Sequence, residues 1–351
     1  MIDMEKKNFD AVDIFKWICS FLIMYIHFAP VIIGAPDVDR IISQGVCRVA
    51  VPFFFAASAF FLFCKMGDSK TDARENRKKL LKFCGHILIL YTVWLAIYSA
   101  YYVFYNAHNG LPQKALKQYA LGFFFKGELQ QHLWYLIATV YAAPIVYLLW
   151  RGGRKTLIAG IVICEVLCCL EWPYRFLPFL KSSAWADVVK AYTLPINALL
   201  NGVPMMCIGI LCVKDHKKFS GKKWFYMLLL AAILYAAEVT GLYLYYGSQY
   251  AASGMITRGI FTYCLLNWLF TVDFRLPFKW LGKALRLSST WNYCAHMLAL
   301  MLFHWVLGYQ GLKRYIMVCG LTVISGIPYI VIKLLMDKRR KNKMQRLEMR
   351  G

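Results

Sequence analysis

Apolar segments of about 16 to 23 residues recur along nearly the whole chain, separated by short polar or charged segments. The hydrocarbon core of a bilayer is about 30 Å thick, so a helix of roughly 20 apolar residues crosses it. The pattern therefore predicts an all-α, polytopic membrane protein with about ten transmembrane helices. The predicted spans are residues 14–34, 43–64, 83–105, 132–150, 155–170, 193–213, 224–246, 256–272, 289–310 and 314–335.

Composition excludes an ordinary soluble domain. Hydrophobic residues make up 60% of the 351 residues, and the mean hydropathy is +0.49, well above the range of soluble domains. Segment 1–13 is mixed in charge, and the first apolar segment lacks a small-residue cleavage site. We therefore expect the first span to be retained rather than removed as a signal peptide.

The formal net charge of +23 is distributed unevenly. With the N-terminus inside, twenty-nine Lys and Arg residues lie in the predicted inner segments and ten in the outer ones. Cytoplasmic loops carry such an excess, so we expect both termini in the cytoplasm and no nucleic-acid partner. Residues 1–335 form the predicted membrane domain, and residues 336–351 form a basic cytoplasmic tail that contacts anionic lipid. The sequence leaves open whether a soluble domain follows in a longer protein.

Lys16 and His27 are two ionisable residues in the first predicted span. Eleven residues correspond to roughly 16 Å of α-helix and about 1100° of turn, so the two side chains share nearly the same face. Lys16 is expected near the membrane surface and His27 near the middle, where charge is costly and commonly functional. This stripe is a candidate reaction path.

Arg48 is expected to enter the membrane by a turn or two from the outer face, because apolar character begins at Ile41. A lone arginine there either faces protein, water or ligand, or extends its charged end to the membrane surface. Pro52 follows one turn later, where it frees a backbone carbonyl and predicts a kink. Such kinks are typical of helices that border a cavity.

Lys79 and Lys82 lie where the third span meets the predicted cytoplasm, after Arg74, Arg77 and Lys78. Two cations three residues apart share a helix face and suit a phosphate-rich cofactor. Positive-inside charge explains the same residues equally well. Both interpretations stay open.

The predicted outer surface carries aromatic and basic segments. His132 and Trp134 begin the fourth span there, either as interfacial residues or as part of a substrate site. Segment 106–131 has the mixed apolar and basic pattern of an interfacial helix, which could cover a cavity. Segment 171–192 combines Trp, Tyr, Pro and single charges, which predicts an anchor at the interface.

His296 lies one helical turn after Asn292 in a late span. This spacing predicts a hydrogen bond between the two residues. The preceding Ser288 and Ser289 are expected to cap the helix.

Other polar residues inside predicted spans have structural explanations as well as functional ones. Glu165 and Glu238 have no evident partner in the sequence, and each is either a proton carrier or a protonated or paired structural group. Asn197 and Asn201 lie one turn apart, as in pairs that hydrogen-bond between helices.

Known catalytic and metal-binding motifs are missing from the sequence. The twelve cysteines are scattered, mostly in apolar segments, without a CxxC pair or a His/Cys cluster, so we expect neither disulfides nor a metal site. No P-loop, GxSxG, HExxH or Gly-rich dinucleotide motif occurs, which argues against ATP-driven transport, serine hydrolases and Rossmann enzymes.

Several segments, in order and over nearly the whole chain, resemble the bacterial membrane acyltransferase-3 family. The family's first span carries an arginine, ten residues and then a histidine, and here Lys16 stands in the arginine position before His27. RVAVPFFFAASAFFLF (48–63) is similar to the second-span segment, and KKLLKF (78–83) to the RRLLRI stretch with its RxxR motif. The later similarities are HLWYLIATVYAAPIVYLL (132–149), GVPMMCIGILC (202–212) and SSTWNYCAHMLAL (288–300).

The resemblance implies a multi-pass enzyme of the bacterial plasma membrane that O-acylates envelope glycans or related hydroxyl acceptors. Acetyl-CoA would bring its acyl end into an intramembrane cavity, with its phosphates near Lys16, Lys79 and Lys82. His27 would be the general base for the acceptor hydroxyl, because neutral imidazole accepts protons near pH 7. Arg48 would orient the acceptor or stabilise the developing oxyanion.

His132 and His296 are expected by resemblance to bind the acceptor or set helix register, and Trp134 to bind the acceptor. Lysine replaces arginine at two motifs, and lysine binds phosphate as a point charge rather than bidentately.

A branch of the same family forms membrane modules fused to serine or alanine racemases, where the attributed role is amino-acid supply. RVAVPFFF and HLWY resemble that branch too. The alternative function is therefore transport of a small amino acid such as serine, with Arg48 binding its carboxylate and His27 binding or relaying a proton. A membrane scaffold without activity is a third alternative.

Overall fold

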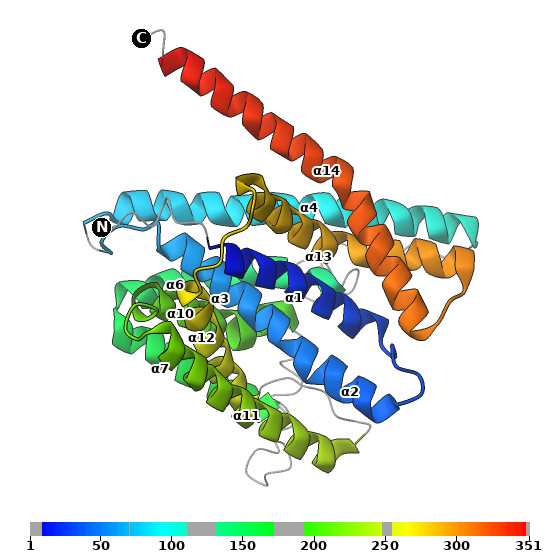
Figure 1. The fold of residues 1–351 in the computed structure, drawn as a ribbon, viewed down its shortest axis with the longest axis horizontal. Coiled ribbons are helices and arrows are strands. Elements are labelled where there is room, and N and C mark those ends of the chain that lie inside the picture. The colour runs from blue at the N-terminus through cyan, green and yellow to red at the C-terminus, as the bar shows by residue number, and fades with distance from the viewer. Residues whose placement is uncertain (1–8, 70, 111–130, 172–192, 248–254, 349–351) are drawn as a thin grey trace. The chain divides into compact units, whose positions relative to one another are not determined.

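The computed structural model describes residues 9–69, 71–110, 131–171, 193–247 and 255–348, and the regular structure within them is helical (Figure 1). The elements are α1 (Asp10–Phe28), α2 (Pro36–Gln44), η1 (Val46–Val49), α3 (Ala50–Phe63), α4 (Ala73–His108), η3 (Gln131–Leu133), α6 (Trp134–Arg151), α7 (Arg154–Glu171), α9 (Thr193–Asn197), η5 (Ala198–Gly202), α10 (Val203–Asp215), α11 (Gly221–Tyr246), α12 (Ile256–Thr271), α13 (Lys279–Leu307) and α14 (Gly311–Glu348).

Seven helical segments in the described ranges are long and apolar enough to cross a membrane. They are Asp10–Phe28, Pro36–Phe63, Ala73–His108, Trp134–Arg151, Pro195–Asp215, Gly221–Tyr246 and Gly311–Arg340. Three further predicted spans coincide with α7, α12 and α13, which are not among these seven. The predicted all-α membrane architecture is confirmed, whereas the count of about ten spans and the cytoplasmic termini stay predictions.

The helices form two compact units. One unit comprises the described residues between 51 and 272, and the other comprises the described residues of 8–50 and 273–351. The second unit is therefore discontinuous in sequence, because its first helices come from the beginning of the chain and its last from the end.

In the unit formed by residues 51–272, α3 is apolar on all sides and largely buried, as expected of a helix surrounded by protein. Gly209 on α10 lies directly against the α3 backbone. A Cβ atom added at Gly209 would stand 2.0 Å from the carbonyl oxygen of Ala56. The missing side chain is what lets the two backbones approach, as small residues do between membrane helices.

A buried carboxylate ties three segments of this unit together. Arg154, at the start of α7, donates to both oxygens of Asp215 at 3.0 and 2.9 Å. The Tyr263 hydroxyl donates to Asp215 at 2.8 Å, and the Lys218 amine lies 2.7 Å from it. The hydrogen bond to Asp215 raises the pKa of Arg154 above its ordinary value. Asp215 thus joins α7, the end of α10 and α12.

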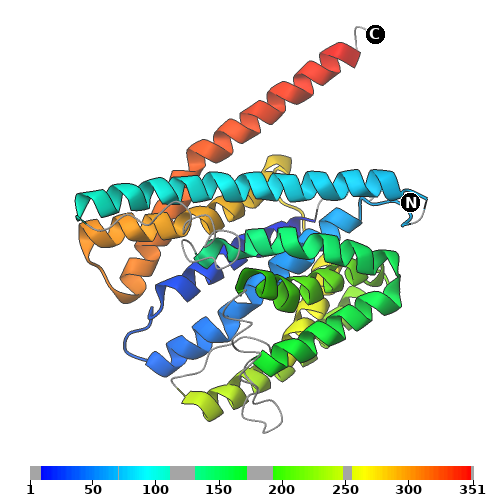
Figure 2. The same ribbon diagram turned by 180° about the vertical axis from the view of Figure 1, so that it is seen from behind.

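In the unit formed by residues 8–50 and 273–351, α1 packs against α13 and α14. Asp39 of α2 organises the turn that follows α1. One carboxylate oxygen accepts hydrogen bonds from the Tyr25 hydroxyl at 2.8 Å and from the backbone amides of Val31 and Ile32 at 2.9 Å. These bonds fix the path of the chain between the two helices. The C-terminal part of α14, red in Figures 1 and 2, extends beyond α1 and α13.

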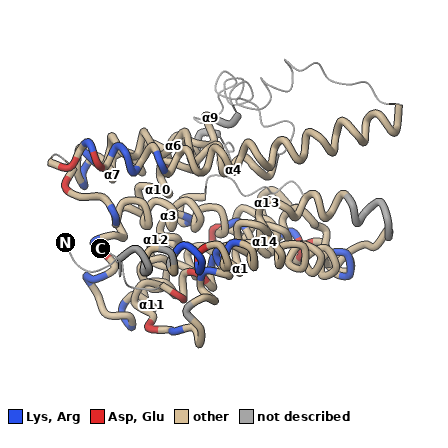
Figure 3. Tube along the Cα trace, turned by 90° about the horizontal axis from the view of Figure 1, so that it is seen from above, with Lys and Arg blue, Asp and Glu red and all other residues tan. Residues whose placement is uncertain are grey.

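Helices extend beyond the predicted spans at their charged ends. α4 begins at Ala73 rather than 83, α13 at Lys279 rather than 289, and α14 continues through the predicted tail as far as Glu348. Hydropathy detects where hydrocarbon ends, but a helix can continue into water when its side chains are charged. Figure 3 shows this in α4: its Lys, Arg and Glu residues lie in the first turns, and the rest of the helix contains no Lys, Arg, Asp or Glu.

Three local predictions were wrong. α1 ends at Phe28 rather than 34, where the Asp39 carboxylate captures the following backbone amides. Ser288 and Ser289 do not cap a helix, because α13 begins nine residues earlier. α3 runs continuously past Pro52, since a proline in the first turn removes no helical hydrogen bond.

The predicted interfacial segments lie almost wholly outside the described residues. Of segment 106–131, the structure describes residues 106–110 and 131, and α4 ends within it at His108. Of segment 171–192, it describes residue 171.

The close approach of α3 and α10 generates a stability prediction. We expect Gly209→Ala to lower the free energy of unfolding by about 1 to 3 kcal/mol, because the new methyl group must displace backbone. The matched control is Gly241→Ala in α11, where an added Cβ meets nothing within 4 Å and alanine favours helix. Thermal unfolding in detergent checks this, and equal midpoints for the two variants would contradict the described packing.

The Asp215 cluster generates a second prediction. Asp215→Asn should destabilise the protein by about 1 to 3 kcal/mol, because it removes the charge of a buried acceptor, while its cationic partners Arg154 and Lys218 are half exposed and can turn to water. Asp273→Asn is the control, since its side chain is 83% exposed and contacts the exposed Arg275. Denaturant unfolding of both variants measures the difference, and a neutral Asp215→Asn would show that the cluster contributes little.

Candidate functional site

Lys16 and His27 lie on the same helix, α1, as the sequence predicts. Lys16 lies in the second turn, half-buried, and its charge interacts with that of Asp13. His27 is also half-buried but lies in the last turn of α1, because this helix ends at Phe28. The expected position of His27 in the middle of the first span is therefore corrected to the end of its helix.

A row of hydrogen bonds joins α1 to α13. The Trp17 indole donates to the Ser288 hydroxyl at 3.1 Å, and the Ser289 hydroxyl donates to the Lys16 carbonyl at 3.0 Å. One turn further along, the Asn292 amide donates to the Ser20 hydroxyl at 3.2 Å. Ser288 and Ser289 thus connect two helices. These bonds fix the register in which α1 faces α13.

This register brings His27 beside His296. The two imidazole ring centroids lie 5.2 Å apart with an interplanar angle of 37°, and His296 is fully buried. The Nδ1 atom of His296 lies 3.0 Å from the backbone carbonyl oxygen of Asn292. Since a carbonyl only accepts, Nδ1 carries the proton, and in the neutral ring Nε2 is an acceptor.

The predicted bond between Asn292 and His296 therefore forms through the Asn292 backbone. The Asn292 side chain bonds Ser20 on the other helix. The i, i+4 spacing identified the pair but not which atoms of Asn292 take part.

Arg48 lies in the short turn η1 between α2 and α3. Its Nε and a terminal nitrogen lie 3.2 and 2.7 Å from the Gln44 side-chain oxygen. The guanidinium is half-buried and within electrostatic range of His27. Gln44, which the sequence analysis did not single out, therefore holds the predicted arginine in place.

An ion pair in the same unit was missed from the sequence. Asp13, which is 1% exposed, contacts Arg286 of α13, and Asp10 accepts a hydrogen bond from the backbone amide of Leu276 at 2.9 Å. In the sequence, the two acidic residues in the first turn of α1 belong to a mixed-charge N-terminal segment. Their partners lie more than 260 residues later in the chain. Sequence spacing carries no signal for such pairs.

Lys79 and Lys82 belong to the other unit, the one formed by residues 51–272. Both are exposed in the first part of α4, one turn apart. The Lys79 amine donates to the backbone carbonyl of Lys65, in the loop between α3 and α4. The buried Asn76 holds the same loop through Gly67 and the carbonyl of Asp68. Lys79 thus has a structural contact in addition to its predicted role.

His132 and Trp134 pack within that same unit. His132 is 2% exposed, and its ring lies 5.1 Å from the Tyr98 ring of α4. The Trp134 ring lies 5.9 Å from the Phe55 ring of α3. The two side chains therefore contact aromatic residues of neighbouring helices, and their role in acceptor binding stays a prediction.

The intramembrane acids that lacked an evident partner in the sequence have partners in the structure. Glu165 lies 3.9 Å from Arg258, and Arg258 donates to the Asn201 side chain at 2.8 Å. Glu238 accepts hydrogen bonds from the backbone amides of Ile256 and Thr257, at 2.8 and 2.9 Å, at the start of α12. The structural interpretation of these acids is thereby favoured over that of lone proton carriers. Arg258 was missed because it lies at the edge of a span, where arginine is common.

Next to this cluster, the helix that contains Asn197 and Asn201 has an irregular turn. Residues Ala198–Gly202 form a π turn between α9 and α10. The Asn201 amide lies 3.4 Å from the Asn197 side-chain oxygen. The two asparagines thus interact within one chain segment, and Asn201 also reaches α12 through Arg258.

Half of the eight predicted site residues lie together. Lys16, His27, Arg48 and His296 belong to the unit that contains the α1–α13 pair. The other four are Lys79, Lys82, His132 and Trp134. In the described residues, no group of three or more His, Cys, Asp or Glu side chains is arranged to hold a metal ion.

Comparison with known proteins yields a family and three relatives. The family model described as "Acyltransferase domain" (acyltransferase-3) matches residues 9–334. The chain is 23% identical over 353 residues to an amino-acid racemase of Enterococcus faecalis, covering 96% of this chain and 47% of the relative. A second amino-acid racemase of that organism is 30% identical over 161 residues, 45% of this chain and 21% of the relative.

The third relative is a serine/alanine racemase of Enterococcus gallinarum, 24% identical over 253 residues, which are 66% of this chain and 33% of the relative. The chain spans at most about half the length of these curated relatives. No solved structure matches. The family match covers nearly the whole chain and agrees with the apolar helices, so this multi-pass membrane protein belongs to the acyltransferase-3 family.

Proposed function

We propose that this protein is an O-acyltransferase of the bacterial plasma membrane. It would move an acyl group, most simply acetyl, from cytoplasmic acyl-CoA to a hydroxyl of an envelope glycan or a related acceptor. Family membership supports a membrane acyltransferase. The observation that carries the finer proposal is the pairing of His27 with the buried His296, with Arg48 within electrostatic range.

His27 is the proposed general base. Its imidazole takes the proton of the acceptor hydroxyl as the acceptor oxygen bonds to the thioester carbonyl carbon. When the carbon–sulfur bond breaks, the imidazolium returns that proton to the departing thiolate, so that CoA leaves as a thiol. His27 is half-buried, as this role requires: a substrate can reach the ring, and the protein fixes its orientation.

Arg48 is the proposed stabiliser of negative charge on the carbonyl oxygen. Gln44 accepts two of its N–H groups, and the guanidinium has five in all. The guanidinium is held in place by Gln44, and preorganised cationic donors at such a position contribute several kcal/mol to catalysis.

His296 is the proposed acceptor-binding or positioning residue. The Asn292 carbonyl fixes its tautomer and its orientation. A neutral imidazole held in this way presents Nε2 as an acceptor toward its surroundings. The role fits its full burial next to His27.

Lys79 and Lys82 are the proposed contacts for the phosphates of acyl-CoA, and Lys16 is a further candidate. The two exposed amines, one turn apart on α4, fit phosphate groups as point charges. When bound, acyl-CoA supplies an activated thioester, and the lysines supply only binding energy.

The second candidate function is transport of a small amino acid such as serine. The relatives named amino-acid racemase and serine/alanine racemase favour it. Arg48 would then bind the carboxylate of the substrate, and His27 would bind or relay a proton.

The test of acyl transfer uses the purified protein in nanodiscs with labelled acetyl-CoA, with and without envelope extract. His27→Ala should lower CoA release and label transfer at least about a hundredfold, the usual contribution of a general base. His86→Ala, an exposed histidine on α4, is the control and should retain full activity. Thermal unfolding confirms that each variant is folded.

Two outcomes would overturn the proposal. Full CoA release by a folded His27→Ala variant would remove His27 as the base. If the folded wild type neither binds acyl-CoA nor releases CoA, acyl transfer from acetyl-CoA is excluded. Saturable serine uptake into proteoliposomes would then establish transport.

The proposed phosphate contacts generate a separate prediction. Lys79→Ala with Lys82→Ala should weaken acetyl-CoA binding on the order of tenfold, since two charge-assisted contacts are lost. Arg74→Ala with Arg77→Ala removes equal charge from the same exposed stretch and should change affinity little. Lys82→Ala alone separates phosphate binding from the contact of Lys79 with the Lys65 carbonyl. Isothermal titration measures all four proteins, and equal affinities would place the phosphates elsewhere.

A further inference from the structure

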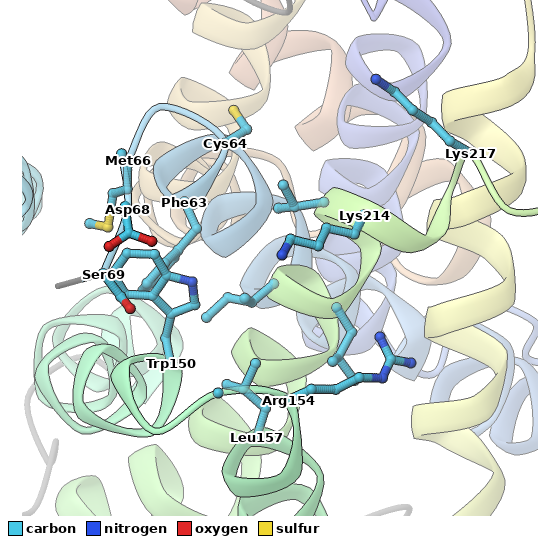
Figure 4. Close-up of a pocket in the computed structure, with 15 residues that line it drawn as sticks. Phe63, Cys64, Met66, Asp68, Ser69, Trp150, Arg154, Leu157, Lys214 and Lys217 are labelled. Carbon is cyan, nitrogen blue, oxygen red and sulfur yellow. The ribbon is translucent and has the colours of Figure 1, made fainter. Parts of the chain in front are cut away.

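A cavity of about 630 Å³ lies within the unit formed by residues 51–272 (Figure 4). Its walls come from the end of α3 and the loop after it, the α6–α7 turn, and the end of α10. The volume suits a small ligand or a lipid headgroup. The lining residues that matter for its chemistry are Asp68, Ser69, Trp150, Arg154, Leu157, Lys214 and Lys217.

The cavity lies where three basic segments meet. Residues 65–82, 151–155 and 214–223 are all predicted inner segments, and together they hold fifteen Lys and Arg residues. Each of the three contributes to the lining. The structure thus gathers loops far apart in sequence at one membrane surface, which the positive-inside rule assigns to the cytoplasm.

The lining cations differ in how they are engaged. Arg154 is held by Asp215 through two hydrogen bonds. Lys214 and Lys217 are exposed, and neither has an ion-pair or hydrogen-bond partner in the part of the chain that the structure describes. Figure 4 shows Lys214 reaching from α10 toward the wall that carries Asp68 and Trp150. Two positive charges are therefore available to a ligand.

Other polar lining groups modify this charge. Asp68 is acidic, but its carboxylate accepts hydrogen bonds from the backbone amide and the hydroxyl of Thr71, at 3.1 and 3.4 Å. Ser69 adds a hydroxyl that can donate to an anion. The lining retains a positive balance, which selects for an anionic ligand.

An apolar stripe leads away from the cavity. Ile158, Val162 and Val166 follow Arg154 on α7 at intervals of four residues, so they share one face of that helix. They are 43%, 55% and 56% exposed. The cationic lining therefore continues into an exposed apolar face that runs along α7. A soluble anion would use the first feature only, whereas a phospholipid would use both.

We propose that this cavity binds the phosphate-bearing headgroup of an anionic phospholipid from the cytoplasmic leaflet. Lys214 and Lys217 contact the phosphate, and the acyl chains lie along Ile158, Val162 and Val166. Basic pockets between membrane helices on this side bind such headgroups in general. None of the proposed acyl-transfer residues is among the residues that line the cavity.

Native mass spectrometry of the delipidated full chain tests the proposal, with dioleoyl phosphatidylglycerol as the probe and dioleoyl phosphatidylcholine for comparison. The wild type should prefer phosphatidylglycerol. Lys214→Ala with Lys217→Ala should weaken that binding about thirtyfold, as expected for two basic residues near a membrane surface. Lys214→Arg with Lys217→Arg should restore it.

Lys155→Ala with Lys222→Ala is the matched control. It removes the same charge from exposed lysines of the same basic segments outside the lining and should change affinity less than about twofold, because only lining charges contact the headgroup. If both double variants lose the same affinity for phosphatidylglycerol, the binding depends on general surface charge, and the proposed site is wrong. A separate titration with CoA distinguishes the soluble source of phosphate: CoA binding that displaces phosphatidylglycerol and is lost in the lining variant would overturn the lipid assignment.

Discussion

Hydrogen bonding between helices is the constraint on which this structure depends, because hydrocarbon offers a polar side chain no partner. The seam between α1 and α13 shows how the constraint is met. Trp17 and Ser20 on α1 form hydrogen bonds with Ser288 and Asn292 on α13, respectively. Successive turns of α1 are therefore matched to successive turns of α13. A shift by one residue would separate all of these donors from their acceptors at once. Polar pairing, more than apolar packing, therefore sets the register of these two helices.

The position of the histidine pair follows from this register. His27 and His296 lie further along the same two helices that the seam aligns, so their separation of 5.2 Å is a consequence of bonds made two turns away. Polar groups elsewhere have a comparable effect: Asp215 joins the start of α7, the end of α10 and the middle of α12, and Glu238 fixes the start of α12. In each case a polar side chain inside a membrane protein determines where its neighbours lie.

Much of the fold and part of the candidate site could be predicted from the sequence. Apolar length located each of the seven described helical segments that are long and apolar enough to cross a membrane, because the thickness of hydrocarbon is fixed. It could not locate helix ends, which depend on charged turns in water at Ala73 and Lys279 and on the Asp39 carboxylate after Phe28. Helical periodicity placed Lys16 with His27, and local spacing placed Asn292 with His296. Pairs such as Asp13 with Arg286 could not be predicted, because no sequence periodicity links residues of different helices.

The discontinuity of the smaller unit has a consequence for the biosynthesis of the protein. The partners Trp17 and Ser288 are 271 residues apart, and ribosomes add about 5 to 20 residues per second. The first helix therefore waits on the order of tens of seconds in the membrane before α13 emerges. During that interval Lys16, Trp17 and Ser20 must be accommodated by lipid headgroups, water or the insertion machinery. A nascent chain that stops before α13 can complete the unit of residues 51–272 but never assembles the histidine pair, so the proposed acyl-transfer residues come together only after that unit has been synthesised.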